Sequence, residues 1–486
     1  MPSRTMKTTV HPSILAACLC GFSTLGVADD VLLIGGGFEP VRSEGQIELN
    51  VRWVQQILNE KGIDVTTWFT DGNSEGADVV SLAPAEETTT LTPLARIFDN
   101  RKFDSLRYRE HAVPDVTGGT DASTLLPALS KRLSADPNSL FLIYNGHGNQ
   151  PSSNAAGASI NLWNNSSLDA VGLHGMLEPR NAPFRWVFAQ CYSGGFHRLA
   201  YDNPITGLQL GEAQRCGFTS ESAYRVAESC SVSLDVGDYR DYTTYFFAAL
   251  SGTERDGDEL DRDPDSNGDG VTSPREAHLY TLEYADSNEL SRSTSEDYLD
   301  EWQPWYLRWL PLRKRLPDNE YAELYRNLAA RLGITLGSRT PSQVRNEIND
   351  LNREHAALQN TRETLRAEEQ QLQTLLRNKL ASSTPALLGP YTQAYKDLAS
   401  SGELERIAQT IASDPDYTDL IVLQDRDDSI DVEMLDIERA IVQRQKLLRM
   451  RRLAHLSEQL DIHGDPESQR DYASLVSCEE VPLTSP

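Results

Sequence analysis

The sequence predicts an α/β protein in which a mostly parallel sheet, flanked by helices, is followed by an α-helical C-terminal region. Three observations indicate this class. Short apolar segments alternate with segments of helical spacing in the first half of the chain, as in sheets covered on both faces. Beyond about residue 316 the pattern is almost wholly helical. Hydrophobic residues make up 39% of the 486 residues, enough for a buried core. The length suggests about two domains.

The first half supplies the strands of the predicted sheet. Four short apolar segments have the character of buried strands. They are residues 30–36, 63–69, 139–145 and 184–190. Segments with apolar residues at helical spacing lie between them, at 47–58, 121–133 and 167–177. The alternation predicts parallel strands joined by crossover helices.

The second half changes character near residue 310, so we place the domain boundaries at 29–312 and 313–486. Trp302, Trp305 and Trp309 cluster there, and Leu316-Pro317 interrupts the chain. In segment 346–380 leucine recurs every seventh residue from Leu351 to Leu372, while the partner positions His355, Arg362 and Glu369 are polar. This pattern indicates a helix that docks one narrow stripe on a neighbour rather than a strong coiled coil. Segment 430–456 is the expected neighbour, with 381–390 as the turn of a helical hairpin.

Two roles remain open for the C-terminal helices. They are either a structural appendage that buries the tryptophan cluster, or a regulatory cap or partner-binding arm. Amphipathic stripes usually mark packing, which favours the appendage.

The composition excludes several function classes. Acidic residues number 72 against 45 basic ones, and the net charge is −27 at pH 7. Such a charge repels phosphate backbones, so we expect no nucleic-acid binding. No segment after the N-terminus has the roughly 18 apolar residues that a membrane span requires.

The N-terminus has the pattern of a secretory signal peptide, residues 1–28. Arg4 and Lys7 precede an apolar run at 13–27, and small residues lead up to Ala28. We expect cleavage after Ala28, and so a secreted or periplasmic protein. A lipoprotein cut before Cys18 is the less favoured alternative, because the apolar run continues past it.

Export affects how the cysteines are interpreted. The chain has six cysteines, of which Cys18 and Cys20 would leave with the signal. The remaining ones are Cys191, Cys216, Cys230 and Cys478. If one must stay free for chemistry, at most one disulfide forms among the other three. The nearness of Cys216 and Cys230 in sequence suggests that pair.

Two of the predicted strands end in groups suited to nucleophilic catalysis. Segment 139–145 leads into Gly146-His147-Gly148, and segment 184–190 leads into Cys191. Ligands bind at the carboxyl ends of strands in open parallel sheets, so we expect the imidazole and thiol to lie side by side. A thiol, a base and nearby amide donors are what such catalysis needs.

The motifs YNGHGNQ (144–150) and VFAQCYSGGF (187–196) resemble the catalytic motifs of the caspase-like clan of cysteine peptidases, and most closely its legumain branch. The likeness extends over roughly residues 30–285. It implies a hydrolase, a secreted cysteine endopeptidase that cleaves protein or peptide substrates through an acyl-enzyme. Cys191 would be the nucleophile and His147 the general base or acid. The backbone amides of Gly148 and Cys191 would be the oxyanion donors.

The specificity pocket departs from that family pattern. The residue two before the nucleophile often lines the pocket in this clan and is commonly acidic or Gln; here it is Ala189. Asp241 is our candidate for an acidic pocket residue, and its alternative role is to cap the helix that follows. The side chain preferred by the pocket stays open.

Segment 265–276, DSNGDGVTSPRE, fits the ligand pattern of an EF-hand calcium loop. The predicted ligands are Asp265, Asn267, Asp269, Val271 and Glu276. Gly270 supplies the sharp turn, and Pro274 is suited to begin the next helix. We expect structural Ca²⁺ and no organic cofactor; a solvated acidic loop is the alternative.

Two other functions remain open at this point. A transpeptidase would use the same acyl-enzyme but pass it to an amine. A non-catalytic binding protein would keep the fold alone, although the presence of both Cys191 and His147 argues against it.

Overall fold

The computed structural model describes residues 30–82, 90–98, 106–135, 138–228, 231–305, 315–389 and 391–483. The predicted signal peptide, Cys230 and Trp309 lie outside these ranges. Among the described residues, no helix combines the length and apolar character that crossing a membrane would take.

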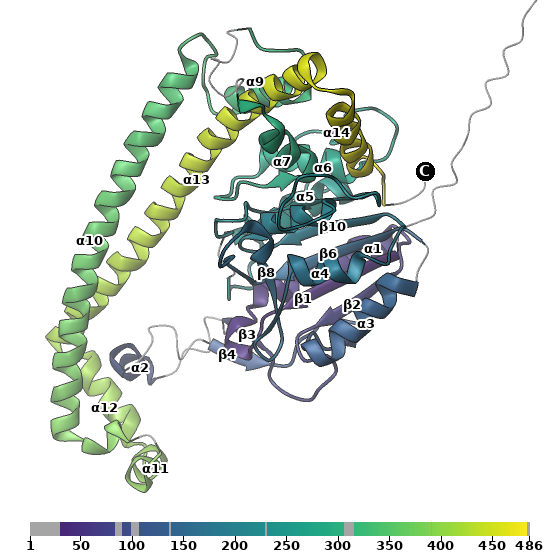
Figure 1. The fold of residues 1–486 in the computed structure, drawn as a ribbon. Helices are drawn as coiled ribbons and strands as arrows, with labels where there is room; N and C mark the ends of the chain where they lie inside the picture. Colours follow the sequence, from purple (N-terminus) through teal and green to yellow (C-terminus); the bar gives the residue numbers. More distant parts are fainter. Residues whose placement is uncertain are drawn as a thin grey trace, which may run out of the picture.

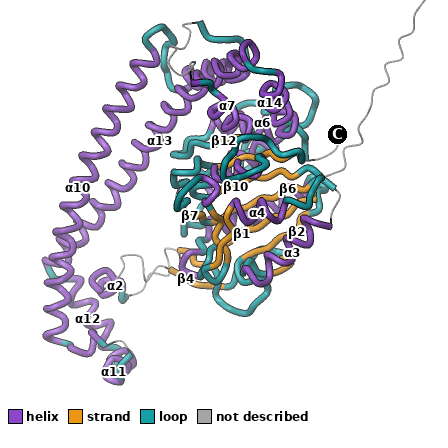
Figure 2. Tube along the Cα trace, viewed as in Figure 1, coloured by secondary structure: helices purple, strands orange, loops and turns teal. Residues whose placement is uncertain are grey.

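A seven-stranded sheet forms the centre of the α/β part (Figures 1 and 2). In sheet order its strands are β12 (Arg292–Ser293), β11 (Arg215–Thr219), β10 (Phe184–Ala189), β6 (Leu140–Gly146), β1 (Asp30–Gly36), β2 (Val65–Phe69) and β5 (Val116–Gly118). All neighbouring pairs are parallel except β11 with β12. The predicted mostly parallel sheet is therefore confirmed, and the four predicted strands are β1, β2, β6 and β10.

Apolar side chains alternate between the two faces of the sheet, and each face has its own helices. Val31 and Leu33 of β1 join one apolar cluster, whereas Leu32 and Ile34 join the other. The first face packs against α1 (Gly45–Glu60), α5 (Tyr242–Ser251) and α6 (Pro274–Tyr284). The second packs against α3 (Ala122–Ala135), α4 (Ala170–Leu177), the 3-10 helix η5 (Ser193–Ala200) and α14 (Pro466–Glu479).

Two small antiparallel sheets were not predicted. One pairs β3 (Val79–Leu82) with β4 (Leu106–Arg109), and the other joins β7 (Gly148–Asn149), β8 (Ser159–Leu162) and β9 (Ser166–Asp169). The predicted helix 167–177 is accordingly shorter than expected. Asp169 ends β9 and caps α4 by accepting a hydrogen bond from the Gly172 N–H at 2.7 Å. A capping aspartate marks the true start of that helix.

The C-terminal region is helical, as predicted, and its two long helices form a hairpin beside the α/β body (Figure 1). These are α10 (Thr340–Ser383) and α13 (Pro415–His463). The other helices of the region are α9 (Glu320–Arg331), α11 (Gln393–Ser400), α12 (Glu403–Ala412) and α14, and α7 (Thr294–Trp302) comes just before it. The predicted turn at 381–390 is wrong, because the 3-10 helix η7 (Pro385–Leu388), α11 and α12 all lie between the long helices.

The hairpin contacts the rest of the chain at both ends. Its base packs with α9, where Trp302 joins an apolar cluster, whereas Trp305 is 74% exposed. The predicted burial of the tryptophans is therefore correct for the first and wrong for the second. Its far end holds α2 (Thr92–Phe98), a short helix from the N-terminal half. The Arg377 Nε–H donates to the Ile97 carbonyl at 2.5 Å there.

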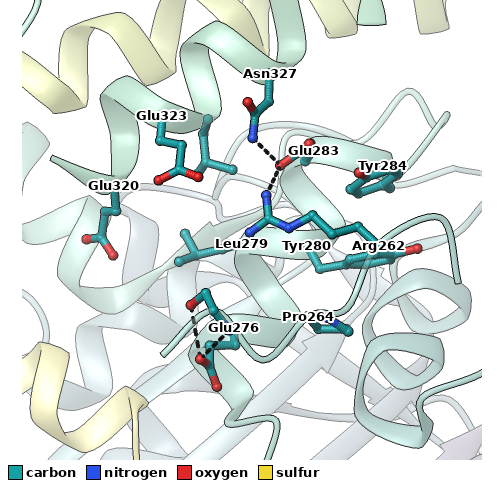
Figure 3. Close-up of a pocket in the computed structure, with 12 residues that line it drawn as sticks. Arg262, Pro264, Glu276, Leu279, Tyr280, Glu283, Tyr284, Glu320, Glu323 and Asn327 are labelled. Atoms are coloured by element: carbon teal, nitrogen blue, oxygen red, sulfur yellow. Dashed lines mark hydrogen bonds and ion pairs between the residues drawn. The ribbon is translucent and has the colours of Figure 1, made fainter. Parts of the chain in front are cut away.

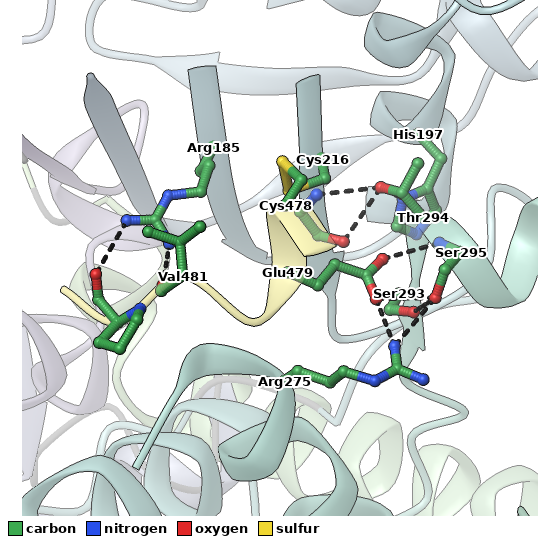
Figure 4. The surroundings of a disulfide bond; sticks show 12 residues. Arg185, His197, Cys216, Arg275, Ser293, Thr294, Ser295, Cys478, Glu479 and Val481 are labelled. Atoms are coloured by element: carbon green, nitrogen blue, oxygen red, sulfur yellow. Dashed lines mark hydrogen bonds and ion pairs between the residues drawn. A yellow bond between two sulfur atoms is a disulfide. The ribbon is translucent and has the colours of Figure 1, made fainter. Parts of the chain in front are cut away.

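The chain returns to the sheet after the hairpin. Cys478 of α14 forms a disulfide with Cys216 of β11, and the Arg185 guanidinium of β10 donates to the Val481 carbonyl (Figure 4). The suggested Cys216–Cys230 pair is therefore wrong. Closeness in sequence was a poor guide, because α14 packs on the sheet face where Cys216 lies. The last helix belongs to the body's core rather than to a detachable arm.

Candidate active site

The register of the sheet brings His147 and Cys191 to the same edge. Strands β6 and β10 are neighbours, with Asn145 opposite Ala189. His147 lies two residues beyond Asn145, after the end of β6. Cys191 lies two residues beyond Ala189, after the end of β10. Both side chains line a single cavity of about 290 Å³, which Ala189 also lines. Both residues thus follow the carboxyl ends of adjacent strands and line the same cavity, as expected.

The turn after Cys191 is sharp and closely packed. Tyr192 adopts a left-handed backbone conformation, with φ of 61°, which is uncommon for a residue other than glycine. Its N–H donates to the Arg225 carbonyl at 2.9 Å, which fixes the turn. Gly148 lies against this turn: a Cβ there would sit 2.3 Å from the Cys191 carbonyl oxygen. Only glycine permits this approach of β7 to the cysteine.

The two predicted oxyanion donors therefore differ in position. Cys191 lines the cavity, together with Gly146 and His147. Gly148 instead packs behind the cysteine, against its carbonyl group. An oxyanion role for either amide stays a prediction.

The Cys191 thiol is partly buried and accepts a hydrogen bond from the Ala227 N–H at 3.4 Å. Burial raises its pKa, and the carboxylates of Glu289 and Glu221 raise it further. The sulfur is therefore a neutral thiol at neutral pH. It needs a neighbouring base to become a nucleophile.

Glu44 fixes the orientation of His147, and sequence reasoning missed it. His147 Nε2 lies 2.9 Å from Glu44 Oε2, and the ring meets Phe38 edge-on with centroids 5.8 Å apart. A carboxylate accepts hydrogen bonds, so this contact fits the imidazole tautomer with its proton on Nε2, which leaves Nδ1 as the free ring nitrogen. Glu44 comes shortly after β1, the other neighbour of β6. The sequence could have indicated Glu44, because residues that follow β1 lie near the same end of the sheet as His147.

Asp241 does line the cavity, as predicted. It stands at the N-cap position of α5, but its side chain makes no capping bond to the backbone. Its carboxylate instead accepts hydrogen bonds from Asn50 Nδ2 and from the Thr244 hydroxyl, each at 2.6 Å. The position thus matches the capping interpretation, whereas the carboxylate faces the pocket.

Glu289 is a second buried carboxylate of the cavity, 3% exposed. It accepts a hydrogen bond from the Glu228 N–H at 3.3 Å. Burial raises its pKa well above its usual range, and Asp241, Glu228 and Glu221 add to the shift. Nothing in the sequence around residue 289 predicted that Glu289 would line the cavity.

The predicted calcium loop folds around its own acidic side chains. Asp265 Oδ1 accepts hydrogen bonds from the N–H groups of Gly268 at 2.7 Å and Asp269 at 3.2 Å, and Oδ2 accepts from Gly270 at 2.8 Å. Asn267 Oδ1 accepts from the Asp269 N–H at 2.8 Å, and Asp269 Oδ1 from the Val271 N–H at 2.9 Å. These bonds wrap the loop into a compact turn.

Glu276 connects the loop to α6, which begins at Pro274 as predicted. Its Oε1 accepts from the Ser266 N–H at 2.9 Å, and its Oε2 from the Ser273 N–H at 2.9 Å. Figure 3 shows Glu276 in the wall of a pocket, with Glu320 and Glu323 of α9 across from α6. Within the described residues, no three His, Cys, Asp or Glu side chains gather as a metal site would need. The oxygen donors of the loop are nonetheless of the hard type that Ca²⁺ prefers.

No model of a known protein family matches the chain, and no curated protein does.

Proposed function

We propose that this protein is a cysteine endopeptidase that cleaves peptide bonds with Cys191 as nucleophile and His147 as proton carrier. The observation that carries the proposal is the pairing of the two residues at the ends of β6 and β10, facing one cavity. Cys191 is also the free cysteine of the described residues, since Cys216 and Cys478 form a disulfide. The resemblance of both motifs to the caspase-like clan supports the same assignment.

The reaction follows from the protonation states at the site. His147 Nδ1 accepts the thiol proton as Cys191 Sγ attacks the scissile carbonyl carbon. The C–N bond then breaks, the imidazolium gives its proton to the leaving amine, and a thioester remains on Cys191. Water attacks the thioester, with His147 again accepting a proton, and releases the carboxylic acid and the thiol. Glu44 touches neither bond; it is a positioning residue that holds the imidazole.

Export and calcium binding belong to the same proposal. The N-terminal signal pattern and the disulfide favour an oxidising compartment outside the cytoplasm. The hard oxygen donors of Asp265, Asn267, Asp269 and Glu276 are suited to hold Ca²⁺ and to relieve the repulsion between their charges. The role of that ion would be structural.

Cleavage of a peptide library by the mature protein tests the function. Wild type should cleave a subset of peptides, and Cys191→Ala should cleave none while keeping the wild-type melting temperature. A peptide with an electrophilic carbonyl should form one covalent adduct, located at Cys191 by mass spectrometry. Cleavage by Cys191→Ala at the wild-type rate would overturn the proposal. Adding an amine nucleophile distinguishes hydrolysis from transpeptidation by the product formed.

A further inference from the structure

We propose that the cavity beside Cys191 selects a basic side chain, lysine or arginine, on the residue whose carbonyl is attacked. This inference rests on the proposed peptidase function, and it names the substrate class of the same site. The argument comes from which charges line the cavity and which of them are balanced.

Carboxylates dominate the lining of the cavity. Four acidic residues contribute to it and one basic residue, Arg42. The acids are Glu44, Glu228, Asp241 and Glu289. All of its lining residues lie between Arg42 and Glu289, so the helical hairpin takes no part in the wall.

Two of the four acids are balanced by partners of their own. Glu44 holds His147, with 2.9 Å between Oε2 and Nε2. Glu228 forms an ion pair with Arg439 of α13. These two carboxylates are already used in holding the site together.

The other two acids have only neutral hydrogen-bond donors among their described contacts. Asp241 is 8% exposed and accepts from the amide of Asn50 and the hydroxyl of Thr244. Glu289 is 3% exposed and accepts from the backbone of Glu228. A buried carboxylate without a cation is costly, so a cationic ligand in the cavity would gain the attraction of both.

Two cationic side chains, Arg255 and Lys446, interact electrostatically with Asp241 and Glu289 without lining the cavity. The Arg255 guanidinium donates to Asn50 and Thr244, so it reaches Asp241 through those two residues. Lys446 Nζ donates to the Ala285 carbonyl at 3.2 Å, and burial lowers its pKa to about 8. Neither side chain lines the cavity. Burial raises the pKa of Glu289, so a cation in the cavity would favour its ionised form and pair with both acids from the side that Arg255 and Lys446 do not reach.

Gln190 supplies an independent sign that the cavity holds a ligand. The side chain is 1% exposed and lines the cavity. In the described structure neither its Nε2 nor its Oε1 has a hydrogen-bond partner. Such orphaned buried groups are rare in folded proteins, and a polar group of a substrate in the cavity would be a suitable partner for them.

Other side chains suit the cavity less well. An acidic side chain would meet like charge at Asp241 and Glu289. An aliphatic one would exclude water from both carboxylates without pairing them. A carboxamide would hydrogen bond but would leave the charge uncompensated. Of these side chains, only a cation would both pair with the carboxylates of Asp241 and Glu289 and compensate for their burial.

Peptides that differ in one residue test the inference. The series carries Arg, Lys, citrulline, Asn, Asp or Leu at the attacked position, citrulline being the neutral analogue of Arg. We expect kcat/KM for Arg to exceed that for citrulline by about 100-fold, since truncating one partner of a buried charge pair costs about 2–5 kcal/mol. Asp241→Asn and Glu289→Gln should each reduce this ratio about tenfold or more. Asp238→Asn, which removes an exposed charge three residues away, should leave it unchanged.

A binding measurement separates the pocket from the chemistry. Agmatine, which carries the guanidinium alone, should bind Cys191→Ala by calorimetry and fail to bind Cys191→Ala/Asp241→Asn. Cleavage without a preference for Arg and Lys would overturn the pocket and leave the peptidase function standing. If no peptide is cleaved but agmatine binding depends on Asp241, the peptidase function is overturned and the pocket stands. Failure of both measurements would overturn both.

Discussion

The α/β body and the helical hairpin are held together in different ways. In the body, strands such as β6 are buried along their whole length, and apolar clusters cover both faces of the sheet. The hairpin helices contain 44 and 49 residues, with apolar clusters where the base meets α9 and where the far end meets α2. Between these ends, ion pairs join α10 to α13, including Arg362 with Asp427 and Arg444 with Glu347.

This difference indicates which part fixes the site. Close-packed strands position residues precisely, because a shift of one residue would move a whole set of side chains to the other face. The more exposed ion pairs of the hairpin, such as Arg444 with Glu347, contribute little and tolerate change. We therefore expect the chemistry to depend on the body, and the hairpin to matter only where it contacts the cavity wall, at Arg439 and Glu228.

The largest effect should come from the body's His147. Replacing it by Ala removes the base from a thiol whose pKa is raised by burial, so the rate should fall by about 10²–10⁴-fold. Glu44→Gln keeps the shape but loses the charge that orients the ring, and should cost less. Initial rates on a good peptide substrate measure both.

The pH profile separates the two roles. His147→Ala should leave a slow rate that rises with pH as the thiol ionises on its own. Glu44→Gln should keep a base, with kcat reduced more than KM is changed. If His147→Ala kept the wild-type rate, His147 would not be the base. The claim that the reaction depends on the α/β body would then be wrong.

Much of this body follows from the sequence, because four of the sheet strands, β1, β2, β6 and β10, are short apolar runs. Strands β6 and β10 were predicted within a residue at either end, and their parallel order placed His147 beside Cys191. Of the hairpin's long helices, the first was predicted from leucine spacing and the second as its neighbour, although their true ends lie further out. Local patterns suffice where local burial decides the structure.

The missed features depend on contacts between distant segments. Glu44 reaches His147 across 103 positions, and Glu289 enters the cavity from a segment without any recognisable motif. Cys216 and Cys478 are separated by 262 positions, and only the packing of α14 on the sheet brings them together. No spacing rule in a single sequence encodes such pairs.

The second largest effect should come from the disulfide that ties α14 to the body. Cys216→Ser/Cys478→Ser should lower the free energy of unfolding by about 2–4 kcal/mol, because the unfolded chain regains the freedom of a very long loop. Chemical denaturation in the absence of reductant measures this. Cys191→Ser is the control and should unfold like wild type. Unchanged stability in the double variant would mean that the apolar packing of α14 alone holds it to the sheet.

Calcium should have an intermediate effect, at loop 265–276 beside the contact of α6 with α9. Ca²⁺ at about 100 times its Kd would stabilise the folded state by about 2.7 kcal/mol through binding to that state. Thermal melts in calcium and in chelator should differ accordingly. Asp265→Ala should abolish the difference, and Asp258→Ala, in the acidic stretch upstream, should not. Equal melts of wild type in both buffers would refute the site.

The smallest effect should come from a contact between the hairpin and the cavity wall. Arg439 pairs with Glu228, and its neighbour Glu438 accepts a hydrogen bond from Asn288 Nδ2 at 3.0 Å. Arg439→Ala frees Glu228, which should loosen the wall and change kcat/KM by about fivefold, for a loss of about 1 kcal/mol. The change should appear in KM rather than kcat, because Cys191 and His147 stay in place.

Arg426→Ala breaks an exposed pair with Glu433 further along α13 and should leave both constants unchanged. A faster Arg439→Ala enzyme would instead show that the hairpin restrains the site, as the cap hypothesis requires. An unchanged enzyme would limit the hairpin to a role in stability or in binding a partner.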